Sequence, residues 1–279
     1  MTAFLLVVVK LCVSGLVFAV GLGATPADLA SLTRRPGLLL RSLLAMYVAV
    51  PLLALAAAWM LPLPPGVKVA LLVLAISAGA PLLPRKLIGL QSDAYVFSLV
   101  VLSSLLAIVT VPLWLAWLGA LFERDAPVSP LGVARVIGIS LLLPLAVGML
   151  VRRAAPAWSA NVADGFLRVL GMVFVVAALG LLVLHLPLLA AVPGSGWIAL
   201  GVLTVAALAC GHLLGGPDPD DRTALAVCCA TRHIGVAALA AAAVPGVNTL
   251  VLLLAYLVVA APVSFLYLRW RQRAGPAPG

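Results

Sequence analysis

The sequence predicts an all-α membrane protein that crosses the bilayer many times. Of its 279 residues, 65% are hydrophobic and only 9% are charged, whereas soluble domains contain about 25% charged residues. The mean hydropathy is +1.27. Apolar stretches of the length that a spanning helix requires, ~20 residues, alternate with short segments rich in Pro, Gly or charged residues. Lipid is therefore the expected solvent for most of the chain.

The apolar stretches divide into nine predicted spans. Their approximate limits are 1–22, 38–60, 67–91, 94–121, 131–151, 165–185, 196–216, 222–244 and 247–269. Helix-start and turn signals separate them, such as Thr25-Pro26-Ala27-Asp28 and Pro217-Asp218-Pro219. We expect a single transmembrane domain over 1–273 and a disordered tail over 274–279.

The basic residues indicate the orientation rather than a nucleic-acid surface. The net charge is +9, but the Lys and Arg residues lie at predicted helix ends instead of on one face. They gather in alternate loops, which marks the cytoplasmic side of a membrane protein. We therefore expect the plasma (inner) membrane, with the N-terminus outside and the C-terminus in the cytoplasm. The residues that decide this are Arg34, Arg35 and Arg41 after the first span, Arg152 and Arg153 after the fifth, and Arg269, Arg271 and Arg273 after the ninth.

The four cysteines do not predict a disulfide, a metal site or a cofactor. All four, Cys12, Cys210, Cys228 and Cys229, lie inside apolar stretches and lack the spacing of metal ligands. Such cysteines are typically small buried hydrophobic residues.

Two spans are interrupted by residues that do not suit a helix in lipid. The third contains Ser77, Gly79, Pro81 and Pro84, and prolines free backbone carbonyls that lipid cannot satisfy. The eighth contains Cys228-Cys229-Ala230-Thr231-Arg232-His233-Ile234-Gly235. Broken helices in matching places of two halves are the best sequence indication of a transporter's binding site. The halves are then a first repeat over about 1–122 and a second over about 131–269.

Charged residues at membrane depth point to the same two spans. Arg232 and His233 lie near the middle of the eighth span, where a charge costs ~3 kcal/mol unless it faces a cavity or a partner. Arg85 and Lys86 have an alternative, because their long side chains could extend to the cytoplasmic interface. Lys10 could pair with a carbonyl or lose its proton. The full set of candidate substrate or coupling residues is Arg232, His233, Thr231, Gly235, Arg85, Lys86, Pro81, Pro84, Ser77, Gly79, Lys10, Ser103 and Ser104.

Several segments together resemble the bile acid/sodium symporter family. They are Gly21–Leu29 followed by Arg34-Arg35-Pro36, the break at Ser77–Pro84, the small residues of the fourth span, and Arg232–Ala243. The resemblance implies two inverted five-helix repeats, a core in which two broken helices cross, and a panel that moves against it. The chain resembles this architecture without the family's first helix, which agrees with nine spans.

The sequence departs from the family where sodium would bind. The resemblance implies an intramembrane glutamate on the second crossing helix, but the matching stretch here is Cys228–His233, and Glu123, the only glutamate, lies in a loop. The hydroxyls of Ser77, Ser103 and Ser104 supply neither the number of ligands nor the negative charge that a hard cation prefers. The guanidinium and ammonium groups at the crossing could instead occupy the place of the lost cations.

These observations predict a secondary transporter that moves a small organic anion by alternating access, as a uniporter, an exchanger or a proton-coupled carrier with His233 or Lys10 titrating. The alternative is a sodium symporter that holds its ions with backbone carbonyls and serines. An intramembrane enzyme is not expected, since the sequence has no HExxH motif and its aspartates Asp28, Asp93 and Asp164 lie at helix ends. A sensor or a channel is also disfavoured. The expected partners are the anionic solute and the lipid bilayer, and not nucleic acid.

Overall fold

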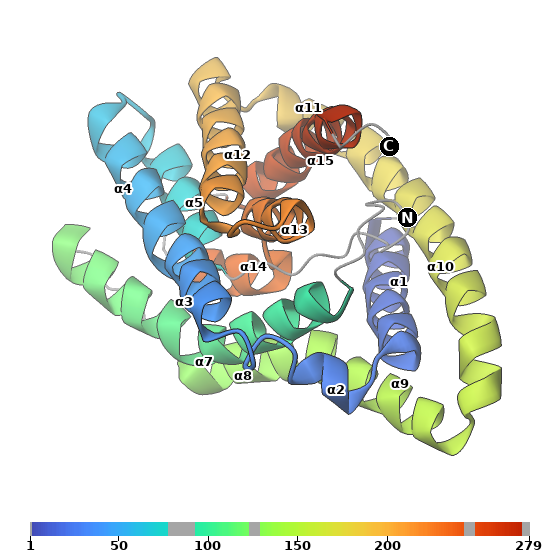
Figure 1. Cartoon of the computed structure of the whole chain (residues 1–279). Coiled ribbons are helices and arrows are strands. Elements are labelled where there is room, and N and C mark those ends of the chain that lie inside the picture. The colour runs from blue at the N-terminus through green and yellow to red at the C-terminus, as the bar shows by residue number, and fades with distance from the viewer. Residues whose placement is uncertain (1, 78–92, 123–128, 243–248, 275–279) are drawn as a thin grey trace.

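A computed structural model describes residues 2–77, 93–122, 129–242 and 249–274, and all of its regular elements are helical (Figure 1). Within these residues, eight helices are long and apolar enough to cross a membrane. They are α1 (Thr2–Gly23), α3–η1–α4 (Pro36–Leu44, Ala45–Ala49, Val50–Met60), α7 (Asp93–Phe122), α8–η2–α9 (Pro130–Ile137, Gly138–Leu142, Leu143–Ala154), α10 (Pro156–Leu184), α12 (Gly194–Leu214), α13–α14 (Pro219–Ala230, Ile234–Ala242) and α15 (Thr249–Ala274). Short helices α2 (Pro26–Leu29), α5 (Pro65–Ile76) and α11 (Leu186–Ala190) complete the described elements.

The predicted all-α membrane fold is confirmed, and most predicted spans lie close to the observed helices. The largest difference is at α10, which begins at Pro156 rather than near residue 165. Asp164 and Arg168 lowered the local hydropathy there without ending the helix. The third predicted span, 67–91, corresponds to α5, which ends at Ile76, and residues 78–92 lie outside the described part of the chain.

Two of the long helices contain a π-helical turn, each followed by a proline. Pro51 comes shortly after η1 and has no N–H to donate to the carbonyl of Tyr47, four residues earlier. The indole Nε1–H of Trp114, on α7, donates to that carbonyl at 3.1 Å. Pro144 follows η2 in the same way. Such turns in α-helices are commonly found at functional sites.

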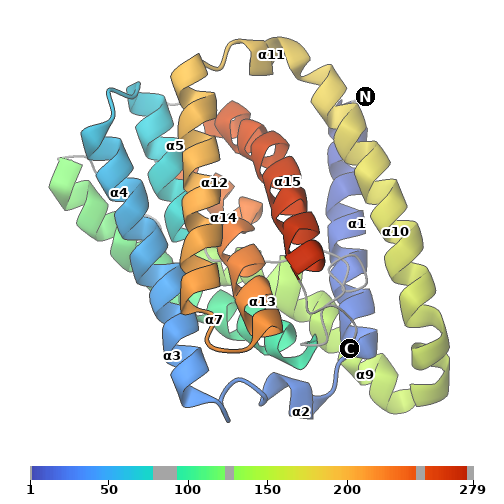
Figure 2. The same ribbon diagram turned by 45° about the horizontal axis from the view of Figure 1, so that its top comes forward.

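Helices α1, α9 and α10 form one group, which we call the outer group, and they lie side by side in both ribbon views (Figures 1 and 2). Helices α1 and α9 touch backbone to backbone at Gly21 and Gly148. A Cβ atom added to Gly148 would lie 2.3 Å from the carbonyl oxygen of Phe18, and one added to Gly21 would lie 2.4 Å from that of Leu145. Small residues permit this close approach, which gives helices in lipid their van der Waals contact. The Phe18 and Phe166 rings pack edge to face between α1 and α10.

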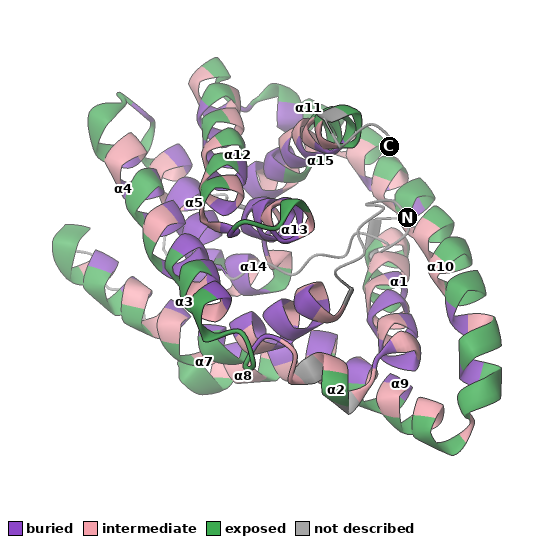
Figure 3. Ribbon diagram, viewed as in Figure 1, coloured by how far each residue is buried: buried purple, intermediate pink, exposed green. Residues whose placement is uncertain are grey.

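The remaining helices form the central group, in which α13 is the most enclosed (Figure 3). Every residue from Thr223 to Ala230 is buried. Helix α12 packs closely on it, because a Cβ atom added to Gly211 would lie 2.4 Å from the Cα of Ala226. By contrast, much of α10 is exposed in Figure 3, as expected for a helix that faces lipid.

Helix α8–η2–α9 belongs partly to each group. Its first part, α8, packs on α7 and α14 of the central group, and its last part, α9, packs on α1. The π-helical turn η2 lies between these two parts. The helix therefore connects the two groups at the place where its hydrogen-bond pattern changes.

The linker between α1 and α3 is fixed to the central group. Thr25 and Asp28 form a reciprocal cap of α2, with Thr25 N–H and Oγ1–H donating to the Asp28 carboxylate and Asp28 N–H donating to Thr25 Oγ1. At the end of the linker, the half-exposed Arg35 donates to the buried carboxylate of Asp221 at 2.5 Å. This hydrogen bond raises the pKa of the Arg35 guanidinium. The joint between the two groups therefore lies close to Gly23 and Ala24.

Candidate functional site

The first side of the candidate site is the C-terminal end of α5. The helix ends at Ile76 because Ser77 has an extended backbone, with φ −73° and ψ 113°. The hydroxyl of Ser77 turns back and donates to the carbonyl of Leu74 at 2.8 Å. Because a helix leaves its last carbonyls without internal partners, Ala75 and Ser77 present acceptors at this point.

The second side is the break between α13 and α14, which confirms the predicted interruption of the eighth span. Helix α13 ends at Ala230, Thr231 has an extended backbone, and α14 begins at Ile234. The Thr231 hydroxyl donates to the carbonyl of Val227 at 2.7 Å. The phenol of Tyr256, on α15, donates to the carbonyl of Ala230. Side chains therefore satisfy the carbonyls that this break frees.

Arg232 connects the end of α5 to the break between α13 and α14, and we call this region the crossing. Its side chain is buried, with 5% of its surface exposed. Its Nη1 donates to the carbonyl of Ala75 at 3.2 Å and makes a longer contact of 3.5 Å with that of Ser77. The Nε and Nη2 atoms have no hydrogen-bond partner among the described residues. A cation at a helix C-terminus is favoured by the helix dipole, so the guanidinium stabilises the end of α5 through Nη1.

His233 faces the other group of helices. Its Nδ1 accepts the N–H of Val236 at 3.3 Å, and its Nε2 lies 3.4 Å from the hydroxyl of Ser140 on η2. Since the Ser140 hydroxyl donates to the carbonyl of Val136 at 2.6 Å, His233 Nε2 is the donor to Ser140, and the ring is the neutral Nε2–H tautomer. His233 therefore connects the broken helix to the π-helical turn between the two groups.

Gly235 permits the close packing of α14 on α8. A Cβ atom at this position would lie 3.3 Å from Val136 and 3.3 Å from the His233 ring. A larger residue would displace the ring from Ser140. The glycine of the predicted site therefore has a packing role.

Two tyrosines near Arg232 were not predicted from the sequence. Tyr47 and Tyr256 lie within electrostatic range of Arg232, and their phenols donate to the backbone carbonyls of Ser103 and Ala230. Both residues lie inside long apolar stretches, where a phenol requires a partner. That requirement was the signal available in the sequence.

The other predicted residues fall into three sets. Ser103 and Ser104 are buried on α7, which packs against α5 and α13; the Ser103 hydroxyl donates to Val100, and that of Ser104 has no partner within the described residues. Lys10 lies on an exposed position of α1, in the outer group. The remaining candidates lie outside the described residues: Gly79, Pro81, Pro84, Arg85 and Lys86.

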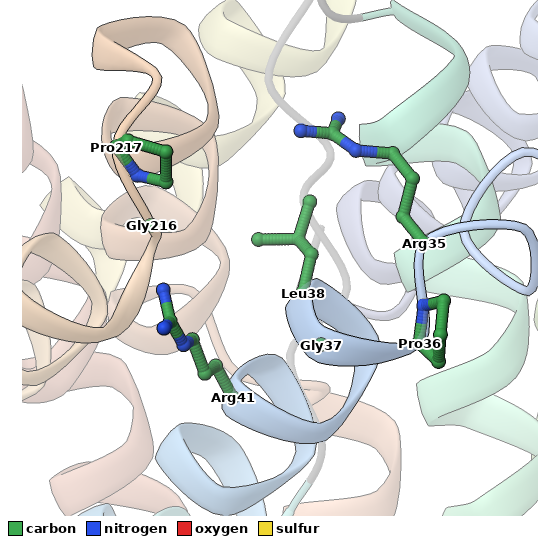
Figure 4. A pocket seen from close by; sticks show the side chains of 7 residues that line it. All are labelled: Arg35, Pro36, Gly37, Leu38, Arg41, Gly216 and Pro217. Carbon is green, nitrogen blue, oxygen red and sulfur yellow. The ribbon is translucent and has the colours of Figure 1, made fainter.

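A separate cavity of about 290 Å³ lies where α3 begins, away from the crossing. Figure 4 shows Arg35, Leu38 and Arg41 on one side and the turn between α12 and α13, at Gly216 and Pro217, on the other. Its walls contain none of the residues predicted for the site. Among the described residues, no group of three or more His, Cys, Asp or Glu side chains could hold a metal ion.

Comparison with known proteins identifies the family. The model of the sodium bile acid symporter family matches residues 10–192, which is more than half of the chain. The match covers α5 and ends before α12, so the broken helix α13–α14 lies beyond it. No curated protein matches the chain. With the apolar helices of spanning length, this match shows a multi-pass membrane protein with a transport function of this general type. The chain belongs to the sodium bile acid symporter family.

Proposed function

We propose that the protein is a secondary transporter that moves a small organic anion by alternating access, without the sodium coupling usual for its family. The observation that carries this proposal is the position of Arg232, whose guanidinium donates to the end carbonyls of α5. A fixed positive charge occupies the crossing permanently, where a bound cation would occupy it only transiently.

The chemistry of the crossing supports this proposal. Sodium requires several oxygen ligands and benefits from negative charge, yet the stretch Cys228–His233 contains no carboxylate. The carbonyls of Ala75 and Ser77 already accept from a cation. A guanidinium remains charged at every physiological pH and favours oxyanions. The site is therefore better suited to an anion than to sodium.

The arrangement of the helices supports alternating access. The outer group is connected to the central group through the helix α8–η2–α9, at whose π-helical turn Ser140 contacts His233. A second connection is the chain after α1, near Gly23, which leads to the linker that is fixed to the central group. We propose one domain over 1–273, with repeats over about 1–122 and 131–269. Of the predicted tail over 274–279, Ala274 still belongs to α15, and the rest lies outside the described residues. Movement of the outer group would then open the crossing to each side in turn. This is a transport cycle and not an enzymatic reaction.

The contacts of three arginines support the proposed orientation. Arg35 bonds to Asp221, Arg152 to the carbonyl of Leu22, and Arg271 to Thr223 and Pro219. They therefore gather the loops predicted to be cytoplasmic at one end of the molecule. We propose the plasma (inner) membrane, with the N-terminus outside and the C-terminus in the cytoplasm. An alkaline phosphatase fusion active at the C-terminus would contradict this orientation.

One observation favours the alternative, a sodium symporter with a non-standard site. The hydroxyl of Ser104 is buried without a hydrogen-bond partner among the described residues. A serine oxygen and several backbone carbonyls could form part of a cation site. This alternative predicts that uptake depends on the sodium gradient.

The test begins with purified protein and a panel of small carboxylates and sulfonates, screened by thermal shift with and without sodium. The anion that raises the melting temperature most is then labelled and its uptake into proteoliposomes is measured. We expect uptake to be unchanged when choline replaces sodium. A saturable dependence on sodium with a Hill slope above one would overturn the proposal in favour of the alternative.

A further inference from the structure

We infer that Arg232 binds a singly charged carboxylate side-on, through its Nε–H and Nη2–H groups, while its Nη1 remains bonded to the end of α5. This inference rests on the proposed function and names the chemical group by which the solute is recognised. The carboxylate would bridge the edge of the guanidinium that has no partner in the described part of the chain.

The division of the donors around the guanidinium leads to this inference. Nη1 is committed to the carbonyls of Ala75 and Ser77, whereas Nε and Nη2 have no partner among the described residues. In a planar guanidinium, Nε–H and one Nη2–H point in parallel from the same edge. That pair matches the two oxygens of a carboxylate and binds them with two parallel hydrogen bonds.

Burial makes the free edge significant. With 5% of its surface exposed, Arg232 has little access to bulk water, and a buried donor without a partner is destabilising. Buried polar groups in proteins are otherwise nearly always satisfied. In the described part of the chain, Asp164 lies within α10, in the outer group, and the other aspartates lie at helix ends or in loops. None of these lies at the crossing, so a solute would not compete there with an internal carboxylate.

The neighbouring hydroxyl groups favour a carboxylate over a sulfonate. Tyr47, Tyr256 and Thr231 each donate to a backbone carbonyl. The third oxygen of a bound sulfonate would lie outside the plane of the guanidinium and would need a further hydrogen-bond donor. Among the described residues these hydroxyls are already committed, and an unsatisfied buried oxygen is costly.

Charge favours a monoanion over a dianion. His233 is held as a neutral ring by the N–H of Val236 and the hydroxyl of Ser140. Arg232 therefore supplies the single positive charge among the described residues of the crossing. A phosphonate dianion would leave one negative charge without compensation, which is unfavourable away from water.

The test uses the smallest carboxylate as a probe, so that it does not depend on the rest of the solute. Full-length protein with ¹⁵N-labelled arginine is titrated with acetate, methanesulfonate, methylphosphonate and acetamide, and the Nε–H resonances are followed by NMR. The resonance of Arg232 is assigned by its loss in Arg232→Lys. We expect acetate to move it downfield in a saturable manner, more than methanesulfonate or methylphosphonate, whereas acetamide leaves it unchanged.

The substitutions give a second readout. Arg232→Lys keeps the charge but has no fork, so acetate protection of the melting temperature should weaken at least about tenfold in concentration, as expected for loss of a charge-assisted hydrogen bond. The matched control Arg153→Lys, at an exposed arginine at the end of α9, should respond as the unmodified protein does. If Arg232→Lys does not fold, Arg232→Gln replaces it for the assignment, and the titration of the unmodified protein still decides.

The outcomes separate this inference from the proposed function. If the Arg232 resonance does not shift at saturating acetate, or shifts equally with methanesulfonate, the inference that Arg232 binds a carboxylate is wrong, even if uptake is independent of sodium. A resonance that responds to acetate in a protein whose uptake requires sodium supports the fork and contradicts the proposed coupling.

Discussion

The outer group and the crossing hold their helices together in different ways. In the outer group, α1 and α9 meet at Gly21 and Gly148 with their backbones in contact. At the crossing, hydrogen bonds from Arg232, Tyr256 and Thr231 reach carbonyls at helix ends. Lipid supplies no hydrophobic force between helices, so shape provides cohesion in the first region and polar pairing in the second. Helix breaks therefore determine where polar side chains are needed.

The largest expected effect is that of Arg232→Ala, which removes the polar tie and the free fork together. We expect solute uptake to be lost and the free energy of unfolding in detergent to fall by about 1–3 kcal/mol, the value of a charge-assisted hydrogen bond. Arg232→Lys should also lose uptake but lose less stability, because the lysine ammonium can still donate to the carbonyls at the end of α5. Melting and solute binding are measured on the same purified samples. Reduced melting with undiminished affinity in the folded fraction would show that Arg232 is only a structural tie.

The second prediction concerns close packing in the outer group. In Gly148→Ala, the added Cβ atom would lie 2.3 Å from the carbonyl oxygen of Phe18, and such overpacking costs about 1–3 kcal/mol. Gly171→Ala on α10 is the control, since no atom lies within 4 Å of its added Cβ, and alanine suits a helix better than glycine by up to about 1 kcal/mol. Unfolding is followed by titration with a denaturing detergent. Equal stability of the two variants would mean that the glycine contact does not hold the group together.

The smallest expected effect is that of Tyr256→Phe, which removes the donor to the carbonyl of Ala230. The expected loss of stability is about 0.5–1.5 kcal/mol, as for other buried hydrogen bonds. Tyr95→Phe removes the hydroxyl pair with Ser42, 2.8 Å long and outside the crossing, and should cost a similar amount. Only Tyr256→Phe should also weaken solute binding. If the two variants bind the solute equally well, the Tyr256 phenol is not part of the binding site.

The spans and one broken helix followed from the sequence because long apolar stretches and a mid-span basic pair allow few alternatives. The start of α10 was predicted too late, because Asp164 and Arg168 lower the local hydropathy without ending the helix. Arg232 could be singled out by its depth. The groups that accept its hydrogen bonds could not be predicted, because they are backbone carbonyls, which every residue has. The contact between His233 and Ser140 was hidden for another reason: it joins residues 93 positions apart, and nothing local in either segment indicates the other.

An arginine attached to the chain has an energetic consequence for the proposed transport cycle. A sodium ion that enters with the solute brings the free energy of its gradient, but a guanidinium never leaves the protein and contributes affinity without work. Accumulation of the solute would then have to come from exchange for another anion or from proton movement. The loaded site would be neutral and the empty site positive, so the membrane potential would act mainly on the empty carrier, by up to about 2.3 kcal/mol per charge for each 100 mV.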